Sequence, residues 1–227
     1  GDLGVEMQPE DVPPIQRKIV TACRRVGKPV VVATQMLESM ITNPVPTRAE
    51  SADVARAVYD GADAVMLSAE SAAGQYPREA VAMMDRIIRE TEQSSHYHQS
   101  AAVGDREATG SDAISAAARQ VAETVDAKAI VTHTRSGRTA QRASRERPQV
   151  PIIMITPEVD TARQYTIVWG LHCVVSPDMP SLDAVFDEGG RIAVDEGFAQ
   201  KGDQVVLTAG VPFGQVGQTN LLRLLRV

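Results

Sequence analysis

The stretch PVVVATQMLESM, residues Pro29–Met40, decides which fold class the sequence predicts. Its first five residues, 29–33, form an unbroken apolar run that is rich in valine and too short for a helix. Such a run predicts a strand buried on both faces, as in parallel sheets. Thr34 and Gln35 follow at the carboxyl end of this strand, where parallel α/β sheets and barrels bind their ligands. Thr34 is therefore a candidate substrate contact.

Composition limits the classes of protein to consider. With 227 residues, 43% of them hydrophobic, the chain can form one or two domains. A formal net charge of -6 and a pI near 5.3 argue against a nucleic-acid partner. No apolar run approaches the ~20 residues of a membrane span, and no signal peptide is recognisable, so we expect a cytoplasmic protein without membrane contact. Cys23 and Cys173 are too few for a metal quartet and predict structural thiols.

The first ninety residues predict two strands among three helices. The expected elements are a helix capped by Asp11 and ended by Gly27, a strand at 29–33, a helix from the capping box Thr47–Glu50 to Asp60, a strand at 64–67 and a helix at 77–92. Two strands cannot form a stable independent α/β sheet, because both faces and both edges need partners. We therefore expect this region to be part of a larger parallel sheet or barrel, and the opening Gly1-Asp2 to lie within a longer protein.

A change of composition marks a domain boundary. Residues 93–110 are small and polar with little periodicity, which predicts domains at 1–93 and 111–227 joined by a linker at 94–110. His96 and His98 lie in this linker at a spacing that a metal site could use. Without a further ligand nearby, solvated linker histidines are the favoured interpretation.

The second region alternates strands and helices. We expect a helix capped by Ser111 or Asp112, strands at 129–133, 152–155, 172–175, 205–209 and 221–225, and helices from 138, at 160–169 and at 181–196. Such alternation predicts a compact, mostly parallel α/β domain. The connection 210–217 is too short for a crossover helix, so the last two strands should pair antiparallel.

Polar groups capable of chemistry fall at predicted strand ends. Asp2, between two glycines, offers a carboxylate that suits Mg²⁺, and the amides beside it could hold a carboxylate or phosphate. An ordinary turn capped by aspartate is the alternative. Ser68 and Glu70 follow the second strand as Thr34 follows the first. Because all fall at the end of the strands where barrel enzymes place their chemistry, a shared site is favoured.

A second candidate site lies in the second domain. There a hydroxyl-rich and arginine-rich loop follows a strand and opens a helix, so that hydroxyls, guanidinium groups and amides converge at a helix N-terminus, as in phosphate sites. The alternative is a plain glycine-containing turn. The loop consists of Thr134, Arg135, Ser136, Gly137, Arg138 and Thr139.

Four stretches resemble the pyruvate kinase family. These are GDLGVE, KPVVVATQMLESM, NPVPTRAESADVARAVYDGADAVMLSAESAAGQYPREAV and THTRSGRTAQRASRERP, and the resemblance extends over essentially the whole chain. It implies a partial (β/α)8 TIM barrel followed by a Rossmann-like, mostly parallel α/β C-terminal domain. It also implies a glycolytic, allosteric and usually tetrameric enzyme that transfers a phosphoryl group from phosphoenolpyruvate to ADP, giving pyruvate and ATP, with Mg²⁺ or Mn²⁺ and K⁺ as cofactors.

The resemblance also implies roles for individual residues. Asp2 matches a ligand of the divalent metal, and the amides of Gly1 and Asp2 match the site of the substrate carboxylate. Thr34 matches a threonine beside the substrate, while Ser68 and Glu70 match a pair that relays a proton to enolpyruvate. The 134–139 loop matches the site for the phosphate of a sugar-phosphate or AMP effector, with the loop that contains Gly210, Gly214 and Gly217 closing over it.

The sequence also departs from the family pattern. The family's catalytic lysine, its second metal ligand and its K⁺ ligands would precede Gly1, and none of Lys18, Lys28, Lys128 and Lys201 is predicted at the carboxyl end of a barrel strand. We therefore expect the C-terminal portion of a pyruvate kinase, inactive by itself. The alternative is a stand-alone effector-binding or assembly module derived from that family. A dehydrogenase is disfavoured because no G-x-G-x-x-G follows a strand.

Overall fold

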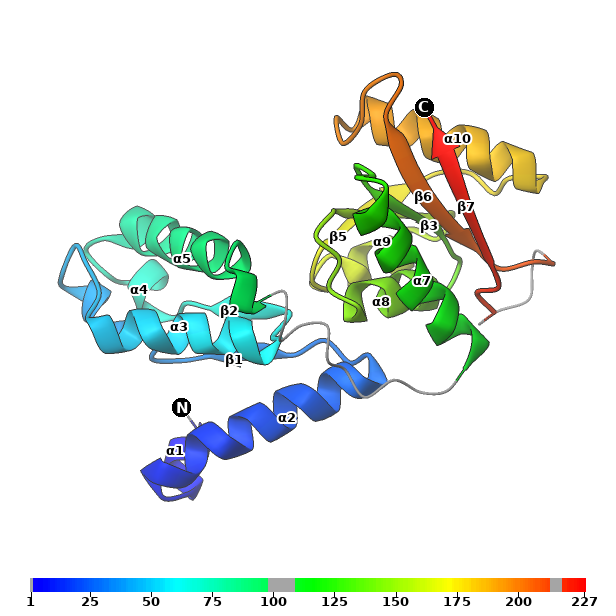
Figure 1. Cartoon of the computed structure of the whole chain (residues 1–227). Coiled ribbons are helices and arrows are strands. Elements are labelled where there is room, and N and C mark those ends of the chain that lie inside the picture. Colours follow the sequence, from blue (N-terminus) through cyan, green and yellow to red (C-terminus); the bar gives the residue numbers. More distant parts are fainter. Residues whose placement is uncertain (1, 98–108, 213–217) are drawn as a thin grey trace. The chain divides into compact units, whose positions relative to one another are not determined.

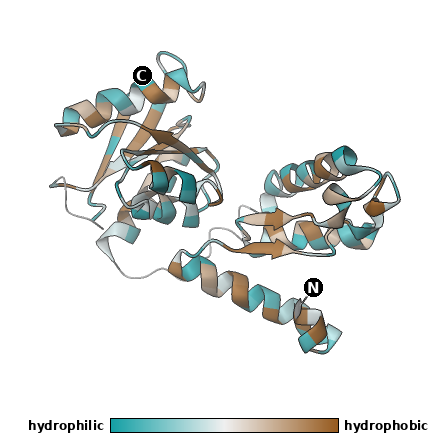
Figure 2. Ribbon diagram, turned by 180° about the vertical axis from the view of Figure 1, so that it is seen from behind, coloured by the Kyte–Doolittle hydropathy of each residue, from teal (hydrophilic) through white to brown (hydrophobic). Residues whose placement is uncertain are grey.

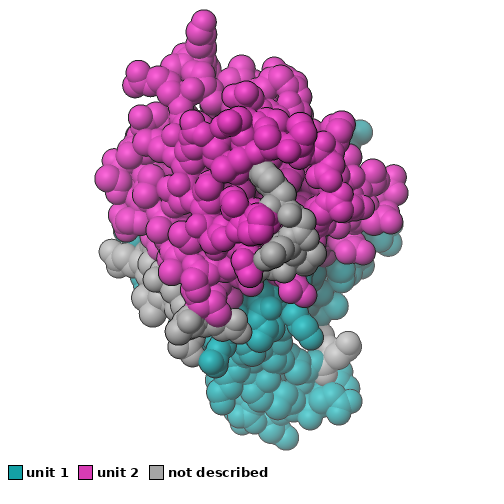
Figure 3. Space-filling view, turned by 90° about the vertical axis from the view of Figure 1, so that its right-hand side faces the viewer, with its two compact units in different colours: residues 1–103 teal, residues 104–227 magenta. Residues whose placement is uncertain are grey.

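The computed structural model describes residues 2–97, 109–212 and 218–227. It contains two compact units, Gly1–Val103 and Gly104–Val227, which are coloured separately in Figure 3. No helix among the described residues combines the length and apolar character that crossing a membrane requires.

The first unit contains a two-stranded parallel sheet (Figure 1). Val31 lies opposite Ala64 and Ala33 opposite Met66, so both strands end at the same edge. The elements are α1 (Asp2–Glu6), the 3-10 helix η1 (Pro9–Asp11), α2 (Val12–Val26), β1 (Val31–Ala33), the 3-10 helix η2 (Glu38–Ile41), α3 (Arg48–Asp60), β2 (Ala64–Met66), α4 (Ala69–Ala72) and α5 (Pro77–Glu92).

Local signals set the helix ends of this unit. Gly27 and Gly61 end α2 and α3 with φ of 70° and 95°, values that favour glycine. The predicted capping box is confirmed, since the Glu50 amide donates to the Thr47 hydroxyl at 3.2 Å and the Glu50 carboxylate accepts from the Thr47 amide. Asp11 is the N-cap residue of α2, as predicted, but its side chain makes no capping hydrogen bond. Instead, α2 begins with prolines in its first turn, whose fixed φ suits a helix start.

The core of the first unit lies to one side of its sheet. Fully buried side chains come from the segment after β1 and from the helices, namely Leu37, Met40, Val54, Ala57 and Ala80. By contrast, Val31 and Met66 are 40% and 43% exposed. Their register places them on the same face of the sheet, whose strands are apolar in Figure 2. This face of the sheet is therefore apolar and uncovered.

The second unit is built on a five-stranded sheet in the order β5-β4-β3-β6-β7 (Figure 1). All neighbours are parallel except β6 and β7, which confirms the predicted antiparallel pair. The elements are α7 (Gly110–Thr124), β3 (Ile130–His133), α8 (Arg138–Arg145), β4 (Ile152–Thr156), α9 (Val159–Tyr165), β5 (Leu171–Val175), α10 (Leu182–Asp195), β6 (Gln204–Ala209) and β7 (Leu221–Arg226).

Helices cover both faces of this sheet. Ile130, Ile152 and Val206 point to the face covered by α7 and α8, whereas the residues next to them along the strands point to the face covered by α10. This alternation explains why the strands are continuous apolar runs in the sequence. The unit is a doubly wound α/β domain, as predicted.

Two helix boundaries in the second unit differ from the prediction. The cap of α7 is Thr109, whose hydroxyl accepts from the Asp112 amide at 3.2 Å, because the Asp112 carboxylate is buried in ion pairs with Arg145 and Arg142. Helix α9 ends at Tyr165 and not at Trp169. The three β-branched residues 166–168 disfavour a helix, and the Thr166 hydroxyl donates to the Arg163 carbonyl.

Candidate functional site

The carboxyl edge of β1 and β2 brings three predicted site residues together. Thr34 follows β1, and Ser68 and Glu70 follow β2, at the edge where the register ends both strands. Glu70 is 2% exposed and accepts hydrogen bonds from the amides of Leu37 at 3.2 Å and Ser68 at 2.7 Å. The Ser68 side chain is exposed, and its hydroxyl forms no hydrogen bond within the described residues.

The backbone after β1 has an unusual conformation. Thr34 and Gln35 have φ of 69° and 56°, in the left-handed region that non-glycine residues rarely adopt. The Thr34 hydroxyl donates to the Ala33 carbonyl at 2.6 Å. Each such residue costs about 1–3 kcal/mol and persists only where its surroundings hold it, often at functional sites. The sequence carries no signal for this conformation, because neither residue is glycine.

Glu50 holds the same segment from α3, and sequence reasoning missed this role. Beyond its capping box, its carboxylate accepts from the Ser39 amide and hydroxyl, both at 2.6 Å. Burial acts to raise the pKa of Glu50, but the hydrogen bonds from Ser39 and Thr47 outweigh it and lower the pKa below its usual value. The segment after β1 is thus held by two carboxylates, and only the capping box was visible in the sequence.

In the second unit the strand order reverses at β3. From β3 the chain proceeds to β4 and β5 on one side, and β6 and β7 lie on the other side. In such sheets ligands bind outside the carboxyl ends of the strands where the order reverses. The loop 134–139 follows β3 and Gly210 follows β6, so both predicted effector segments flank this point. The Thr139 hydroxyl lies 2.9 Å from the hydroxyl of Thr219, which precedes β7.

The 134–139 loop requires glycine at position 137. Gly137 has φ of 76°, and a Cβ atom there would lie 2.2 Å from the Tyr165 ring. The Tyr165 hydroxyl donates to the Ser136 carbonyl at 3.1 Å, and Thr161 donates to the Arg135 carbonyl at the same distance. The loop therefore follows the surface of α9 closely. Likewise, a Cβ at Gly210 would lie 1.9 Å from the Gln218 carbonyl oxygen, while Gly214 and Gly217 lie outside the described residues.

The two arginines of this loop differ in their partners. Arg135 contacts Asp178 at 2.7 Å and Glu158 at 3.9 Å, whereas Arg138 is exposed and has no ion pair within the described part of the chain. Arg138 therefore offers the available positive charge at the start of α8. His133, at the end of β3, is buried, and this burial lowers its pKa; Arg135 also lowers the pKa, while Asp178 opposes the shift.

Comparison with known proteins identifies the family. A model described as "Pyruvate kinase, barrel domain" matches residues 1–81, and one described as "Pyruvate kinase, alpha/beta domain" matches residues 112–225. The chain belongs to the pyruvate kinase family. Its two units thus correspond to part of a pyruvate kinase barrel and to a pyruvate kinase α/β domain, which confirms the predicted fold class.

Individual pyruvate kinases match nearly the whole chain. The chain is 52% identical to the pyruvate kinase of Methylorubrum extorquens, with 99% of the chain and 47% of the relative aligned. It is 49% identical to a pyruvate kinase of Agrobacterium vitis, with 98% of the chain and 48% of the relative aligned. It is 46% identical to the pyruvate kinase of Geobacillus stearothermophilus, with 98% of the chain and 38% of the relative aligned. The chain therefore spans less than half the length of these relatives.

The remaining predicted residues of the pyruvate kinase site lie in or next to α1. Asp2 begins this short helix and is not in a turn, while Gly1 and the Asp2 side chain lie outside the described residues. Among the described residues no three His, Cys, Asp or Glu side chains converge in a way that could hold a metal ion. His96 is exposed and packs edge-on against Tyr59 with the ring centroids 5.3 Å apart, and His98 lies outside the described residues.

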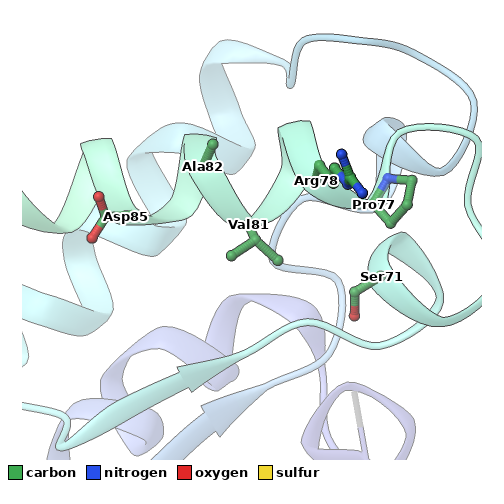
Figure 4. A pocket seen from close by; sticks show the side chains of 6 residues that line it. All are labelled: Ser71, Pro77, Arg78, Val81, Ala82 and Asp85. Atoms are coloured by element: carbon green, nitrogen blue, oxygen red, sulfur yellow. The ribbon is translucent and has the colours of Figure 1, made fainter.

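An open hollow of about 620 Å³ lies between α4 and the first turns of α5. It is lined by Ser71, Pro77, Arg78, Val81, Ala82 and Asp85, all on α4 or the first turns of α5 (Figure 4). It lacks the convergent polar groups of a binding site. The carboxyl edge of β1 and β2 is thus the better candidate in the first unit.

Proposed function

We propose that this chain supplies part of a pyruvate kinase active site and takes part in phosphoryl transfer from phosphoenolpyruvate to ADP. In this reaction an oxygen of the ADP β-phosphate attacks the phosphorus, the enol C–O–P bridge breaks at phosphorus, and the enolate takes a proton at carbon to become pyruvate. The observation that carries the proposal is the meeting of Thr34, Ser68 and Glu70 at one sheet edge in a chain of this family.

Each residue at this edge has a role in the proposal. Thr34 contacts the substrate, with its position fixed by the left-handed turn. The exposed Ser68 hydroxyl takes part in delivering the proton to the enolate. Asp2 supplies one ligand for Mg²⁺ or Mn²⁺, and the amides of Gly1 and Asp2 receive the substrate carboxylate. When bound, the divalent metal and K⁺ neutralise charge on the phosphoryl group.

The proposed site is incomplete within this chain. Lys18 lies in α2, Lys28 precedes β1, Lys128 precedes β3 and Lys201 precedes β6, so no lysine lies at a carboxyl strand end. The uncovered apolar face at Val31 and Met66 fits a sheet that continues in a closed barrel. In the proposal, further barrel strands of the full-length protein complete the site. The full-length protein is proposed to be a cytoplasmic homotetramer.

A coupled assay with lactate dehydrogenase tests the proposal. We expect no turnover from the 227-residue chain alone, because a lone carboxylate cannot hold the metal and none of the four lysines lies at the carboxyl end of a strand. A chimaera in which this chain replaces the matching part of the Methylorubrum extorquens pyruvate kinase should turn over, and its Thr34→Ala variant should lose most of that activity. Turnover by the chain alone, or full activity of the Thr34→Ala chimaera, would refute the proposal.

We further propose that the second unit binds the phosphate of a sugar phosphate or AMP. Support comes from the loop 134–139 at the topological switch point, with Arg138 available beside the amides that open α8. Thr134, Ser136 and Thr139 add hydroxyls, and Gly137 allows the backbone to follow this tight path.

Thermal melting with and without ligand tests this second proposal. Glucose 6-phosphate or AMP should raise the melting temperature of the second unit, and Arg138→Ala should abolish the shift. Arg135→Ala is the matched control and should weaken the shift much less, since its guanidinium is already paired with Asp178 and Glu158. An equal loss in both variants, or no shift with either ligand, would count against the assignment.

A further inference from the structure

The Glu70 carboxylate joins the loops that follow two neighbouring strands. Its Oε1 accepts from the Leu37 amide, three residues beyond Thr34, and its Oε2 accepts from the Ser68 amide, two residues beyond the end of β2. The residue is 2% exposed and belongs to α4. Both oxygens of one buried carboxylate are therefore committed to backbone amides from two different loops.

The loop on the β1 side is the one that needs support. Two successive non-glycine residues, Thr34 and Gln35, are held in the left-handed region, which only surrounding contacts can maintain. Leu37, whose side chain is fully buried, follows the turn, and its amide is held by Glu70. Further along, Glu50 holds Ser39. The turn is thus fixed on its carboxyl side by bonds to charged acceptors, which are stronger than neutral ones.

We propose that Glu70 is a positioning residue, which holds the Thr34 turn against the β2 loop and does not carry the proton. The inference rests on the proposed function, in which Thr34 contacts the substrate. Each Glu70 carboxylate oxygen accepts one amide hydrogen bond and the residue is buried, whereas the Ser68 hydroxyl is exposed and forms no hydrogen bond within the described residues. Of the two residues that the family pattern pairs for proton relay, Ser68 alone is free to meet the substrate.

Amide hydrogen exchange in the 227-residue chain tests the tie, by which we mean the two hydrogen bonds from the Leu37 and Ser68 amides to the Glu70 carboxylate, without a measurement of catalysis. In Glu70→Gln one of the two amides loses its acceptor, because a carboxamide has a single acceptor oxygen. The Leu37 or Ser68 amide should then exchange with solvent about tenfold faster or more. The backbone NMR couplings of Thr34 and Gln35, which report φ, should show that these residues leave the left-handed region. Glu38→Gln is the matched control, since Glu38 is exposed and accepts no hydrogen bond within the described residues. Unchanged exchange in folded Glu70→Gln would overturn the inference.

A second measurement covers the case in which Glu70→Gln does not fold. In the unaltered chain, NMR couplings across the hydrogen bonds should connect the Leu37 and Ser68 nitrogens with the Glu70 carboxyl carbon. Detection of both couplings supports the tie, and the absence of both would overturn it.

Kinetics of the chimaera separate positioning from proton relay. Glu70→Gln and Glu70→Asp should both lower kcat/KM for phosphoenolpyruvate, since the shorter aspartate cannot span the two amides, while the pH profile of kcat keeps its shape. Loss of one limb of that profile in Glu70→Gln would show proton relay and overturn the inference. If Thr34→Ala leaves the chimaera fully active, the proposed function fails while the exchange result still decides whether the tie exists.

Discussion

The two units of this chain fix their candidate sites in different ways. In the second unit a five-stranded sheet covered on both faces sets the point where the strand order reverses, and the loop 134–139 that follows β3 there lies against α9 through Gly137, Tyr165 and Thr161. In the first unit a two-stranded sheet with an apolar open face carries the candidate site, and the carboxylates of the buried Glu70 and the partly exposed Glu50 hold the loop. A complete sheet positions its loops by topology, whereas a partial sheet depends on individual side chains.

The largest expected effect is on independent folding. Residues 104–227 should melt cooperatively by themselves, because their strands are buried between α7 and α8 on one face and α10 on the other. Residues 1–103 should melt broadly and bind a dye for apolar surface, since Val31 and Met66 lie uncovered on one sheet face. Circular dichroism and dye fluorescence measure both. A sharp melt of residues 1–103 at the melting temperature of residues 104–227 would contradict the idea that the first unit is the less self-sufficient of the two.

Gly137→Ala tests how the second unit positions its loop. A Cβ there meets the Tyr165 ring at 2.2 Å, and the φ of 76° is unfavourable for alanine, so we expect a destabilisation of about 2 kcal/mol or more and loss of ligand binding. Gly170→Ala is the matched control, because φ is 69° but no atom lies within 4 Å of the new Cβ. Gly170→Ala should lower the free energy of unfolding by only about 1–2 kcal/mol, the cost of a positive φ for a residue with a Cβ atom. Equal unfolding free energies for the two variants would show that Tyr165 does not constrain the loop.

Sequence patterns predicted much of this architecture because its signals are local. Apolar runs, the capping box at Thr47 and the glycines that end α2 and α3 each act within a few residues. The antiparallel β6–β7 pair followed from the length of one connection. These features do not depend on which distant segments meet.

What sequence analysis missed depends on contacts between distant residues. The order of strands around β3 decides that the loops after β3 and β6 follow neighbouring strands, and no local pattern encodes that order. The amide of Leu37 meets Glu70 thirty-three residues away. Asp112, predicted as a possible cap, instead pairs with Arg145, because burying a carboxylate near a guanidinium requires that contact. The left-handed turn at Thr34 likewise becomes visible only with its neighbours in place.

His133 offers a smaller test, confined to the second unit. Its pKa is lowered, chiefly by burial, so below the usual pKa of 6.5 the unfolded chain takes up a proton more readily than the folded one. The melting temperature of the second unit should therefore fall by roughly a few degrees between pH 7.5 and 5.5. His133→Asn should reduce this dependence, and His96→Asn, in the first unit, should leave it intact. A dependence of the same size in His133→Asn would exclude His133 as its source.

Glu50 offers the corresponding and smallest test in the first unit. Because its pKa is lowered in the folded state, its bonds to Ser39 and Thr47 contribute stability that is fully present above the usual pKa of 4.5 and is lost as the pH falls below it. Glu50→Gln should therefore reduce the protection of the Ser39 amide from exchange at pH 6.5, and the difference from the unaltered chain should shrink below pH 4. Glu79→Gln, an exposed residue in the first turn of α5, controls for a general effect of charge near a helix start. If Glu79→Gln lowered the protection of the Ser39 amide as much as Glu50→Gln does, the direct hydrogen bonds of Glu50 would not be what fixes the segment. Glu70 would then be the one carboxylate shown to hold the loop after β1.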